Sequence, residues 1–322
     1  MLHTTKESTY MTKPQLVSDA DLDTVQYPCM VQPKIDGVRG VHLNGRFTGR
    51  SLDPFKGFGV TDYFSDPKFA GLDGELTLGQ DPTQENLCSN TTGAVNKFVG
   101  VSEMADLHWH CFDLVTEDTV KLRYVERYAH LAQKLRELNH RRLNLVSFKL
   151  CTNRQELDAE IEANFAAGYE GTIIRNPNAL YKEGRPSKKT QEVLRVKAFS
   201  DFEILVTGFT EGNENHNEKT KNALGNSERS SHQENLVPNG QVGSLQGVLL
   251  KDFYDLQGSL LFKAGLAITA SSGKMTIADA TYYYNNPKEL VGHIAKIKTM
   301  TTGVKDLPRF PTFVSLRSEQ DL

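Results

Sequence analysis

The pattern of apolar residues changes near Phe199 of this 322-residue chain, and no other feature constrains the fold as strongly. Before that point, segments with strand and helix periodicity are mixed, which favours an α+β domain. After it, five short strand patterns and one short helical piece occupy roughly 120 residues, a pattern typical of a small β-barrel. We therefore predict two domains, residues 1–199 and 200–322.

Residues 211–241 interrupt the strand patterns of the second domain. They are rich in Asn, Glu, Lys, Ser and Gly and contain almost no large apolar side chain. A segment of this composition cannot bury itself, so we predict a mobile excursion.

Local patterns predict several elements of the first domain. Residues 28–41 read as a strand, a polar loop and a second strand, and Asn44-Gly45 predicts a hairpin turn directly after them. Residues 120–139 have the period of an amphipathic helix, and the alternation at 146–150 predicts another strand.

Charge and cysteine content exclude some classes of protein. A net charge of −3 argues against a general nucleic-acid coat, although local clusters of Lys and Arg can still bind DNA. The four cysteines lie far apart, so they do not have the spacing of a zinc finger, and we expect reduced thiols. We also expect no membrane partner and a location in the cytoplasm, or in a virus-infected host cell, because neither a secretion signal nor a transmembrane pattern is present.

The motif Lys34-Ile35-Asp36-Gly37-Val38-Arg39 is the first candidate for chemistry. Its spacing of Lys, Asp, Gly and Arg arises by chance in roughly 0.5% of chains this long, so chance is a poor explanation. A lysine nucleophile must lose its proton, and a nearby positive charge such as that of Arg39 lowers its pKa. A solvated hairpin loop remains the simple alternative for this motif taken alone.

Further charged groups follow the lysine at intervals. Asp73-Gly74-Glu75 interrupts a short strand pattern, and Glu170 stands where a predicted helix meets a predicted strand. Arg195 and Lys197 alternate on a later strand pattern, which places both cations on one side of it. Such cations need either a buried anion or a solvated face.

Taken in order, these residues resemble the motifs of the covalent nucleotidyltransferases, which include ATP-dependent DNA ligases and mRNA capping enzymes. The resemblance is greatest to the minimal DNA ligases of large viruses, and it extends over nearly the whole chain. The segments that carry it are 34–39, 48–51, 72–76, 111–114, 170–171, 195–197 and 308–317.

The resemblance implies an α+β nucleotidyltransferase (adenylation) domain with antiparallel sheets, followed by an OB-fold β-barrel. Residues 211–241 correspond to the latch, a hairpin inserted in the barrel that closes around DNA. Capping enzymes lack this latch, so it favours a ligase. The implied activity is ATP-dependent sealing of nicks in duplex DNA by a monomer that closes as a clamp, with Mg²⁺ as the metal.

The resemblance also implies roles for single residues. Lys34 would carry AMP, Asp36 would act near the 3′-hydroxyl and ribose, and Arg39 would bind or orient phosphate. Gln32 would read adenine, Phe112 would stack on it, and Glu75 would hold the ribose and Arg39. The implied nucleotide-binding set is Gln32, Arg50, Glu75, Phe112, Arg195, Lys197 and Arg309. Glu170 and Glu75 would bind metal, and Arg39, Arg50, Lys219, Lys221 and Arg229 would contact nucleic acid.

The chain departs from the family pattern at three positions. Arg195 stands where most members have lysine, so a planar fork replaces a point charge. Gln32 is an uncommon residue at the adenine position. The last motif normally ends in an acid and then a base, whereas here Asp321 is followed by Leu322, which would weaken the first step of the reaction.

Two other readings remain open from the sequence. An RNA ligase or an mRNA capping guanylyltransferase would share the same superfamily motifs. A non-catalytic nucleic-acid-binding protein would belong to a different functional class, but such a protein has no need of Lys34.

Overall fold

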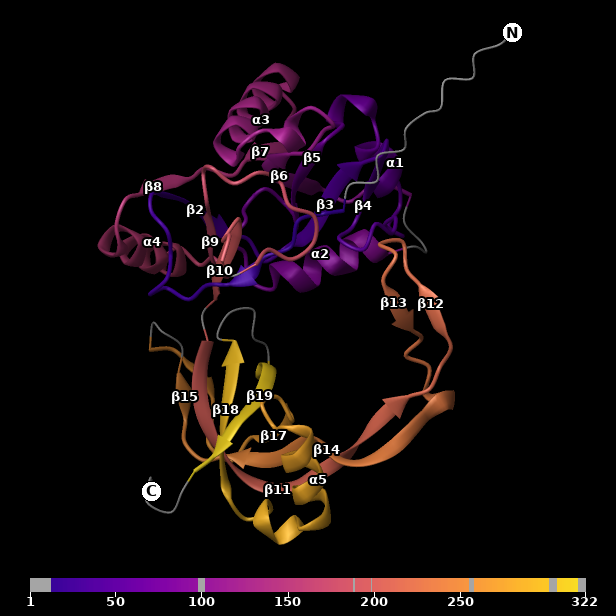
Figure 1. Ribbon diagram of the computed structural model, residues 1–322, viewed down its shortest axis with the longest axis vertical. Coiled ribbons are helices and arrows are strands. Elements are labelled where there is room, and N and C mark those ends of the chain that lie inside the picture. Colours follow the sequence, from indigo (N-terminus) through magenta and orange to yellow (C-terminus); the bar gives the residue numbers. More distant parts are fainter. Residues whose placement is uncertain are drawn as a thin grey trace. The chain divides into compact units, whose positions relative to one another are not determined.

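The computed structural model describes residues 13–97, 102–187, 189–197, 199–254, 258–300 and 306–317. The chain divides into two compact units, Met1–Lys197 and Ala198–Leu322 (Figure 1). Each unit has hydrophobic clusters of its own, and the mixed α+β class predicted from the sequence is confirmed.

Two five-stranded sheets, mostly antiparallel, form the first unit. The first sheet has the order β1-β10-β9-β2-β8 and the second has the order β4-β3-β5-β6-β7. Their strands are β1 (Ser18–Asp19), β2 (Cys29–Lys34), β3 (Val38–Leu43), β4 (Arg46–Thr48), β5 (Leu72–Leu78), β6 (Leu107–Leu114), β7 (Leu143–Leu145), β8 (Lys149–Cys151), β9 (Gly171–Arg175) and β10 (Val193–Lys197).

Helices cover both sheets. Helix α3 packs against β6 and β7, α4 packs against β2, β8 and β9, and α2 packs against β5. The helices and short 3₁₀ turns of this unit are α1 (Val60–Phe64), η1 (Pro67–Phe69), α2 (Leu87–Asn96), η2 (Thr119–Lys121), α3 (Tyr124–Leu138) and α4 (Arg154–Ala166).

The chain passes from one sheet to the other between β2 and β3. β2 ends at Lys34 in the first sheet, and β3 begins at Val38 in the second. The predicted strand–loop–strand is therefore confirmed, and so is the turn that follows it, where Asn44 and Gly45 have φ of 53° and 73°. This crossing places the lysine motif at the junction of the two sheets.

The strand predicted at 146–150 is wrong. β7 ends at Leu145 and β8 begins at Lys149, and these strands belong to different sheets. Val146 lies between them, where its backbone N–H donates to the carbonyl oxygen of Cys111 at 2.9 Å. Val146 is buried, whereas Phe148 and Leu150 are exposed, so the alternation of apolar residues does not mark one continuous strand.

The second unit is built on a closed barrel with the strand order β11-β14-β17-β19-β18. Its apolar interior includes Ile204, Leu245 and Ile297, and α5 packs against β14. The elements of this unit are β11 (Phe199–Asn215), β12 (Lys219–Lys221), β13 (Ser227–Arg229), η3 (Gln233–Asn235), β14 (Leu236–Leu249), β15 (Phe253–Tyr254), β16 (Leu260–Phe262), β17 (Ala267–Ser271), α5 (Ile277–Asn285), η4 (Pro287–Glu289), β18 (Ile294–Met300) and β19 (Arg309–Leu316).

Residues 211–241, which we predicted to be a mobile excursion, contain regular structure. Strands β11 and β14 extend into this segment, and β12 and β13 pair beyond them as an antiparallel hairpin (Figure 1). Polar contacts replace a hydrophobic core there. The side-chain amide of Asn217 donates to the carbonyl oxygens of Ser230 and His232 at 2.9 and 2.8 Å, and Asn235 donates to its oxygen at 3.1 Å.

No helix in the described parts of the chain is both long and apolar enough to cross a membrane.

Candidate active site

The side chain of Lys34 ends in a cluster of alternating charges. Lys34 is the last residue of β2 and lies opposite Gly171 of β9. Its ammonium donates to the carboxylate of Glu170, and the ammonium of Lys197 lies 2.5 Å from the other oxygen of that carboxylate. The backbone N–H of Glu170 also donates to the carbonyl oxygen of Lys34 at 3.0 Å. One buried carboxylate thus holds lysines from two strands.

Two carboxylates near Lys34 titrate differently. Burial raises the pKa of Glu170, but its two lysine partners outweigh burial and the pKa lies below its ordinary value. For Glu75 on β5, the effect of burial is larger than the opposing attraction of Lys34. The negative charges of Glu170 and Asp36 raise the pKa further, and it reaches about 7. Glu170 is therefore ionised at neutral pH, whereas Glu75 is partly protonated.

Two glycines let the backbone approach closely around this cluster. A Cβ atom on Gly37 would lie 2.1 Å from the carbonyl oxygen of Leu76, and one on Gly171 would lie 2.1 Å from that of Val196. No larger side chain fits either position, so glycine is required on both sides of the lysine.

Arg39 is bound to the fold itself. Its Nε and Nη2 donate to the two carboxylate oxygens of Asp73 at 2.8 and 2.6 Å, and its Nη1 donates to the carbonyl oxygen of Gln15 at 2.7 Å. From the sequence we expected Glu75 to hold Arg39, and the structure corrects this expectation. Glu75 lies directly opposite Arg39 on the neighbouring strand, but Asp73 provides the bidentate partner.

A cavity of about 640 Å³ opens beside Lys34 within the first unit. This volume suits a nucleotide-sized ligand. Its lining includes Gln32, Lys34, Arg50, Glu75, Phe112 and Arg195. Arg39 lines it as well, so the structure brings seven of the residues predicted from sequence to one cavity.

Phe112 contributes an aromatic ring to this cavity. It packs against the buried side chains of Ile35 and Val146. The guanidinium carbons of Arg39 and Arg175 lie 5.3 and 5.0 Å from the centre of its ring, which are cation–π distances. The ring is thus held in position and still lines the cavity.

The side-chain amide of Gln32 is occupied by the protein. Its Nε2 donates to the carbonyl oxygen of Val146 at 3.1 Å, and its Oε1 accepts from Nε of Arg175 at 3.0 Å and from the Tyr124 hydroxyl at 3.1 Å. A carbonyl cannot donate and a guanidinium cannot accept, so these partners fix the orientation of the amide. This leaves little of the Gln32 side chain for the adenine-reading role that we expected of it.

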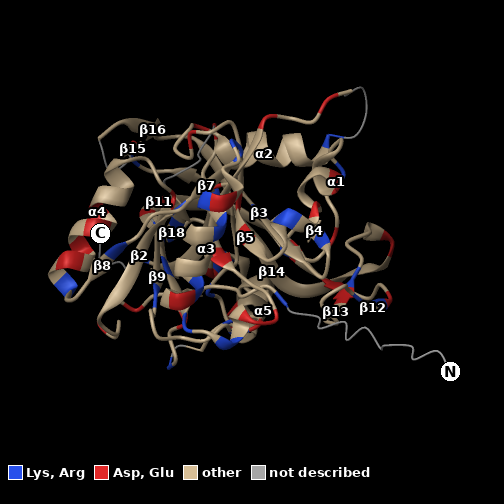
Figure 2. Ribbon diagram, turned by 90° about the horizontal axis from the view of Figure 1, so that it is seen from above, with Lys and Arg blue, Asp and Glu red and all other residues tan. Residues whose placement is uncertain are grey.

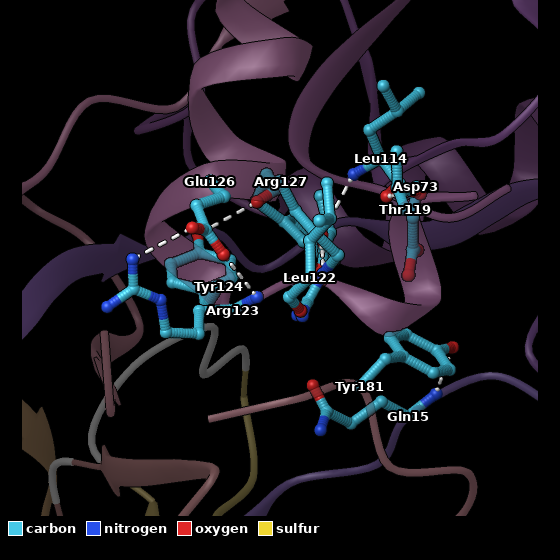
Figure 3. Close-up of polar contacts among 12 residues, drawn as sticks. Gln15, Asp73, Leu114, Thr119, Leu122, Arg123, Tyr124, Glu126, Arg127 and Tyr181 are labelled. Atoms are coloured by element: carbon cyan, nitrogen blue, oxygen red, sulfur yellow. Dashed lines mark hydrogen bonds and ion pairs between the residues drawn. The ribbon is translucent and has the colours of Figure 1, made fainter. Parts of the chain in front are cut away.

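Sequence reasoning missed a buried ion pair beneath the cavity. Arg127 of α3 donates from Nε and Nη2 to Asp113 at 2.9 and 3.0 Å, and both side chains are fully buried. Figure 3 shows Arg127 beside Tyr124 at the start of the helix. The available signal was an arginine on an otherwise apolar face of the 120–139 pattern, because a buried arginine requires an acid.

The remaining cations predicted for nucleotide binding have different surroundings. Arg50 is exposed in the turn after β4, where it lines the cavity. Arg195 on β10 donates from Nε to the carboxylate of Asp19 at 2.6 Å, a contact that the sequence did not predict. Arg309 begins β19 in the second unit and lies 5.5 Å from the ring centre of Phe310.

The end of the last motif, Asp321 and Leu322, lies outside the described residues.

The cations predicted to bind nucleic acid in the second unit lie on the β12–β13 hairpin. Lys219 and Lys221 are exposed on β12, and Arg229 on β13 is the strand partner of Lys219. Arg229 also donates to the carbonyl oxygen of Asn217. Both signs of charge occur on this hairpin (Figure 2).

Glu75 and Glu170 are the carboxylates that we expected to bind magnesium. Within the described residues, no three His, Cys, Asp or Glu side chains form a group that could hold a metal ion. Mg²⁺ is usually bound by one or two carboxylates together with substrate phosphates and water. The charge of Glu170 is one of the causes that raise the pKa of Glu75, so the two carboxylates are close enough to interact, and this pair fits that mode of binding.

Comparisons with known proteins support a common family for the first unit. A family model described as an ATP dependent DNA ligase domain matches residues 14–197. A probable DNA ligase of Streptomyces griseus is 28% identical over 217 residues, which cover 61% of this chain and 40% of that protein. A DNA ligase of African swine fever virus is 24% identical over 142 residues, or 44% of this chain and 32% of that protein. The chain thus spans less than half the length of these curated relatives.

The fold as a whole is similar to that of a solved Lig E DNA ligase. The similarity has a TM-score of 0.67 at 18% sequence identity and covers 95% of this chain and 100% of the other.

Proposed function

This chain belongs to the family of ATP-dependent DNA ligases, and on that premise we propose that it seals nicks between a 3′-hydroxyl and a 5′-phosphate in duplex DNA. The observation that carries the proposal is the contact of Lys34 with buried Glu170 beside a cavity that Phe112 also lines. Nucleotidyl transfer needs a positioned nucleophile, fixed charges and a site for the base.

In the first step, Nζ of Lys34 attacks the α-phosphorus of ATP. A P–N bond forms, the bond from the α-phosphorus to the bridging oxygen breaks, and pyrophosphate leaves. Lys34 must lose a proton and leave the ion pair, while Lys197 remains to neutralise Glu170. The proton of Lys34 passes to water, so that Glu75 stays available to hold the metal.

In the second step, an oxygen of the 5′-phosphate attacks the phosphorus of lysyl-AMP and the P–N bond breaks. In the third, the 3′-hydroxyl attacks the activated 5′-phosphate, and AMP leaves. Asp36, two residues after the lysine, is the residue that we assign to the 3′-hydroxyl and ribose.

The other cavity residues would bind the nucleotide. Phe112 offers a flat apolar face to adenine. Because the amide of Gln32 is bound to the protein, we assign the reading of adenine to main-chain groups instead. Arg50, Arg195 and Lys197 would bind phosphate, and Arg309 would contribute from the second unit. Because Arg39 is bound to Asp73, its role would be to orient the cavity and not to bind phosphate alone.

Magnesium, held by Glu75, Glu170 and the phosphates of ATP, would offset the charge of the departing pyrophosphate.

The second unit would bind duplex DNA as an OB-fold. Its closed barrel has five strands in the order first, second, third, fifth and fourth along the chain, which matches the Greek-key barrels that bind nucleic acids. The β12–β13 hairpin extends the first two of these strands and carries Lys219 and Lys221. We assign it the role of a latch, with which a monomer closes around DNA as a clamp.

The proposal is tested by incubating the protein with α-labelled ATP, Mg²⁺ and a nicked duplex. We expect a covalent AMP adduct and a sealed strand from the wild type, and a loss of at least about 1,000-fold of both from Lys34→Ala, because the nucleophile is gone. Lys121→Ala removes an exposed lysine of η2 and serves as the control.

A wild-type protein that forms no adduct and seals no nick would overturn the proposal. Label that persists on Lys34→Ala would place the nucleophile elsewhere. Labelling by GTP instead of ATP would favour a capping enzyme, and sealing of RNA ends alone would favour an RNA ligase.

A further inference from the structure

A short extended segment near the N-terminus accepts hydrogen bonds from three arginines that line the cavity. Gln15, Val17 and Asp19 alternate along it. The carbonyl oxygen of Gln15 accepts from Arg39 at 2.7 Å, and that of Val17 accepts from Arg185 at 2.9 Å. The carboxylate of Asp19 accepts from Arg195 at 2.6 Å. We call residues 15–19 the strap.

The strap is fixed to the first unit along its length. The backbone N–H of Gln15 donates to the Tyr181 hydroxyl at 2.8 Å, as the dashed line in Figure 3 shows. Leu16 donates to the carbonyl oxygen of Gly184 at 2.7 Å. At its other end, β1 pairs in parallel with β10, where Asp19 lies opposite Arg195. The two backbone acceptors of the strap and the backbone of Asp19 therefore stand in set positions, while the side chain of Asp19 is exposed.

Asp19 differs from the other two acceptors because it is a charged side chain. It uses only Nε of Arg195, and among the described residues this is the one hydrogen bond of that guanidinium. The two terminal nitrogens of the fork remain for an anion in the cavity that Arg195 lines.

This arrangement accounts for an arginine at a position where lysine was expected. A lysine has one ammonium, which would have to serve both Asp19 and the anion. A guanidinium can bind a carboxylate through Nε and still direct its terminal nitrogens elsewhere.

We propose that Asp19 is a positioning residue that orients Arg195 toward the phosphates of the nucleotide. The proposal rests on the proposed function, since that function supplies the anion. Asp19 itself touches no substrate. It acts by reducing the conformational freedom that Arg195 would otherwise lose when the nucleotide binds. The pKa of Asp19 lies below its ordinary value, chiefly because of the hydrogen bond from Arg195, so the carboxylate is ionised at neutral pH.

The test measures the rate of AMP labelling of Lys34 as a function of ATP concentration. We expect Asp19→Ala to raise the half-saturating ATP concentration by about three- to tenfold, the effect of immobilising one flexible side chain. The rate at saturating ATP should change by less than about twofold, since Asp19 does not take part in the chemistry.

Asp23→Ala is the matched control. Asp23 is an exposed aspartate of the same unit that also binds an arginine, Arg154, at 2.9 Å, and that arginine does not line the cavity. We expect its ATP dependence to match that of the wild type. In an Arg195→Lys background, Asp19→Ala should not raise the half-saturating ATP concentration further, because the fork that Asp19 orients is absent and the ammonium no longer has to serve Asp19 as well.

Three outcomes would overturn the proposal. If the wild type is labelled and Asp19→Ala has the same ATP dependence, the proposal for Asp19 is wrong and the proposed function stands. An equal effect of Asp19→Ala in the Arg195→Lys background means that Asp19 acts through another group. No labelling of the wild type removes the proposed function, and this proposal with it.

Discussion

Lysines in the Lys34 cavity and lysines on the β12–β13 hairpin have opposite surroundings. Lys34 and Lys197 both bind the buried carboxylate of Glu170. Lys219 and Lys221 are exposed on a hairpin that has no hydrophobic core. Lysine side chains are therefore bound to a buried carboxylate in the cavity, whereas on the hairpin they are exposed to solvent.

On the proposed function, this difference would provide two ways to bind phosphate. In the cavity, the charges are positioned before the ligand arrives, so they favour one geometry and one reaction. On the hairpin, the lysines keep their freedom, so they suit a contact that depends on charge density and not on exact position. The hairpin backbone is nevertheless regular, and the side-chain amide of Asn217, before the hairpin, donates to the carbonyl oxygens of Ser230 and His232 after it.

The largest effect should come from breaking the pairing in the cavity. Glu170→Gln leaves Lys34 and Lys197 without their anion, and it removes a carboxylate that we assign to the metal. We expect AMP labelling of Lys34 to fall by about 100-fold or more. Labelling rates with α-labelled ATP give the measurement.

Glu160→Gln is the control for that experiment, because Glu160 also pairs with a lysine, Lys149 at 3.2 Å, but lies on α4 outside the cavity. If Glu170→Gln labels as fast as Glu160→Gln, the pairing in the cavity has no catalytic importance.

A smaller effect is expected from removing the hairpin lysines. The double variant Lys219→Ala/Lys221→Ala should bind nicked duplex about tenfold more weakly than the wild type. The slope of log affinity against log salt concentration should become smaller in magnitude by about two, and AMP labelling should be unchanged. Fluorescence anisotropy over a range of salt concentrations measures both quantities.

The matched control for the hairpin removes two exposed arginines of the first unit, with Arg136→Ala and Arg141→Ala. An equal loss of affinity in this control would show that only net charge matters, and the hairpin would then have no special role.

The smallest effect concerns stability and pH. The pKa of Glu75 is about 7 in the folded protein and near 4.5 when unperturbed. Between these values the folded state binds a proton that the unfolded state does not, so the free energy of unfolding falls as pH rises from about 5 to 7. We expect the wild type to lose about 1–2 kcal/mol more than Glu75→Gln over this range, after allowance for the partial exposure of Glu75.

Urea unfolding of both proteins at pH 5 and pH 7.5 gives this measurement. Parallel pH profiles for the wild type and Glu75→Gln would contradict a raised pKa at Glu75.

The sequence predicted the cavity better than its supporting contacts. Lys34, Glu75, Phe112 and Arg195 belong to motifs with fixed local spacing, and the structure places all four on one cavity. The family that these motifs indicated is confirmed by the family model. The partners that hold the motifs were missed. Asp19 binds a residue 176 positions away in the chain, and local patterns carry no signal for contacts of this kind.

The regular structure of the hairpin could not be read from its composition, for a different physical reason. Low hydrophobicity normally means that a segment cannot offset the entropy of folding. Here backbone pairing and the amide of Asn217 supply the contacts instead, and four of the residues in that network are asparagine or serine. A composition rule counts those residues as evidence for disorder, although each is a strong hydrogen-bonding group.

The tight turn at the tip of the hairpin offers a place to attach a fluorescent reporter. Its backbone closes between Asn222 and Asn226, and the exposed side chain of Ala223 lies within it. Three of the four cysteines are buried, and only Cys88 is partly accessible. Ala223→Cys in a Cys88→Ser background therefore gives one reactive thiol, on a tip whose base is anchored by Asn217. A dye at that thiol would report the movement of the hairpin in real time.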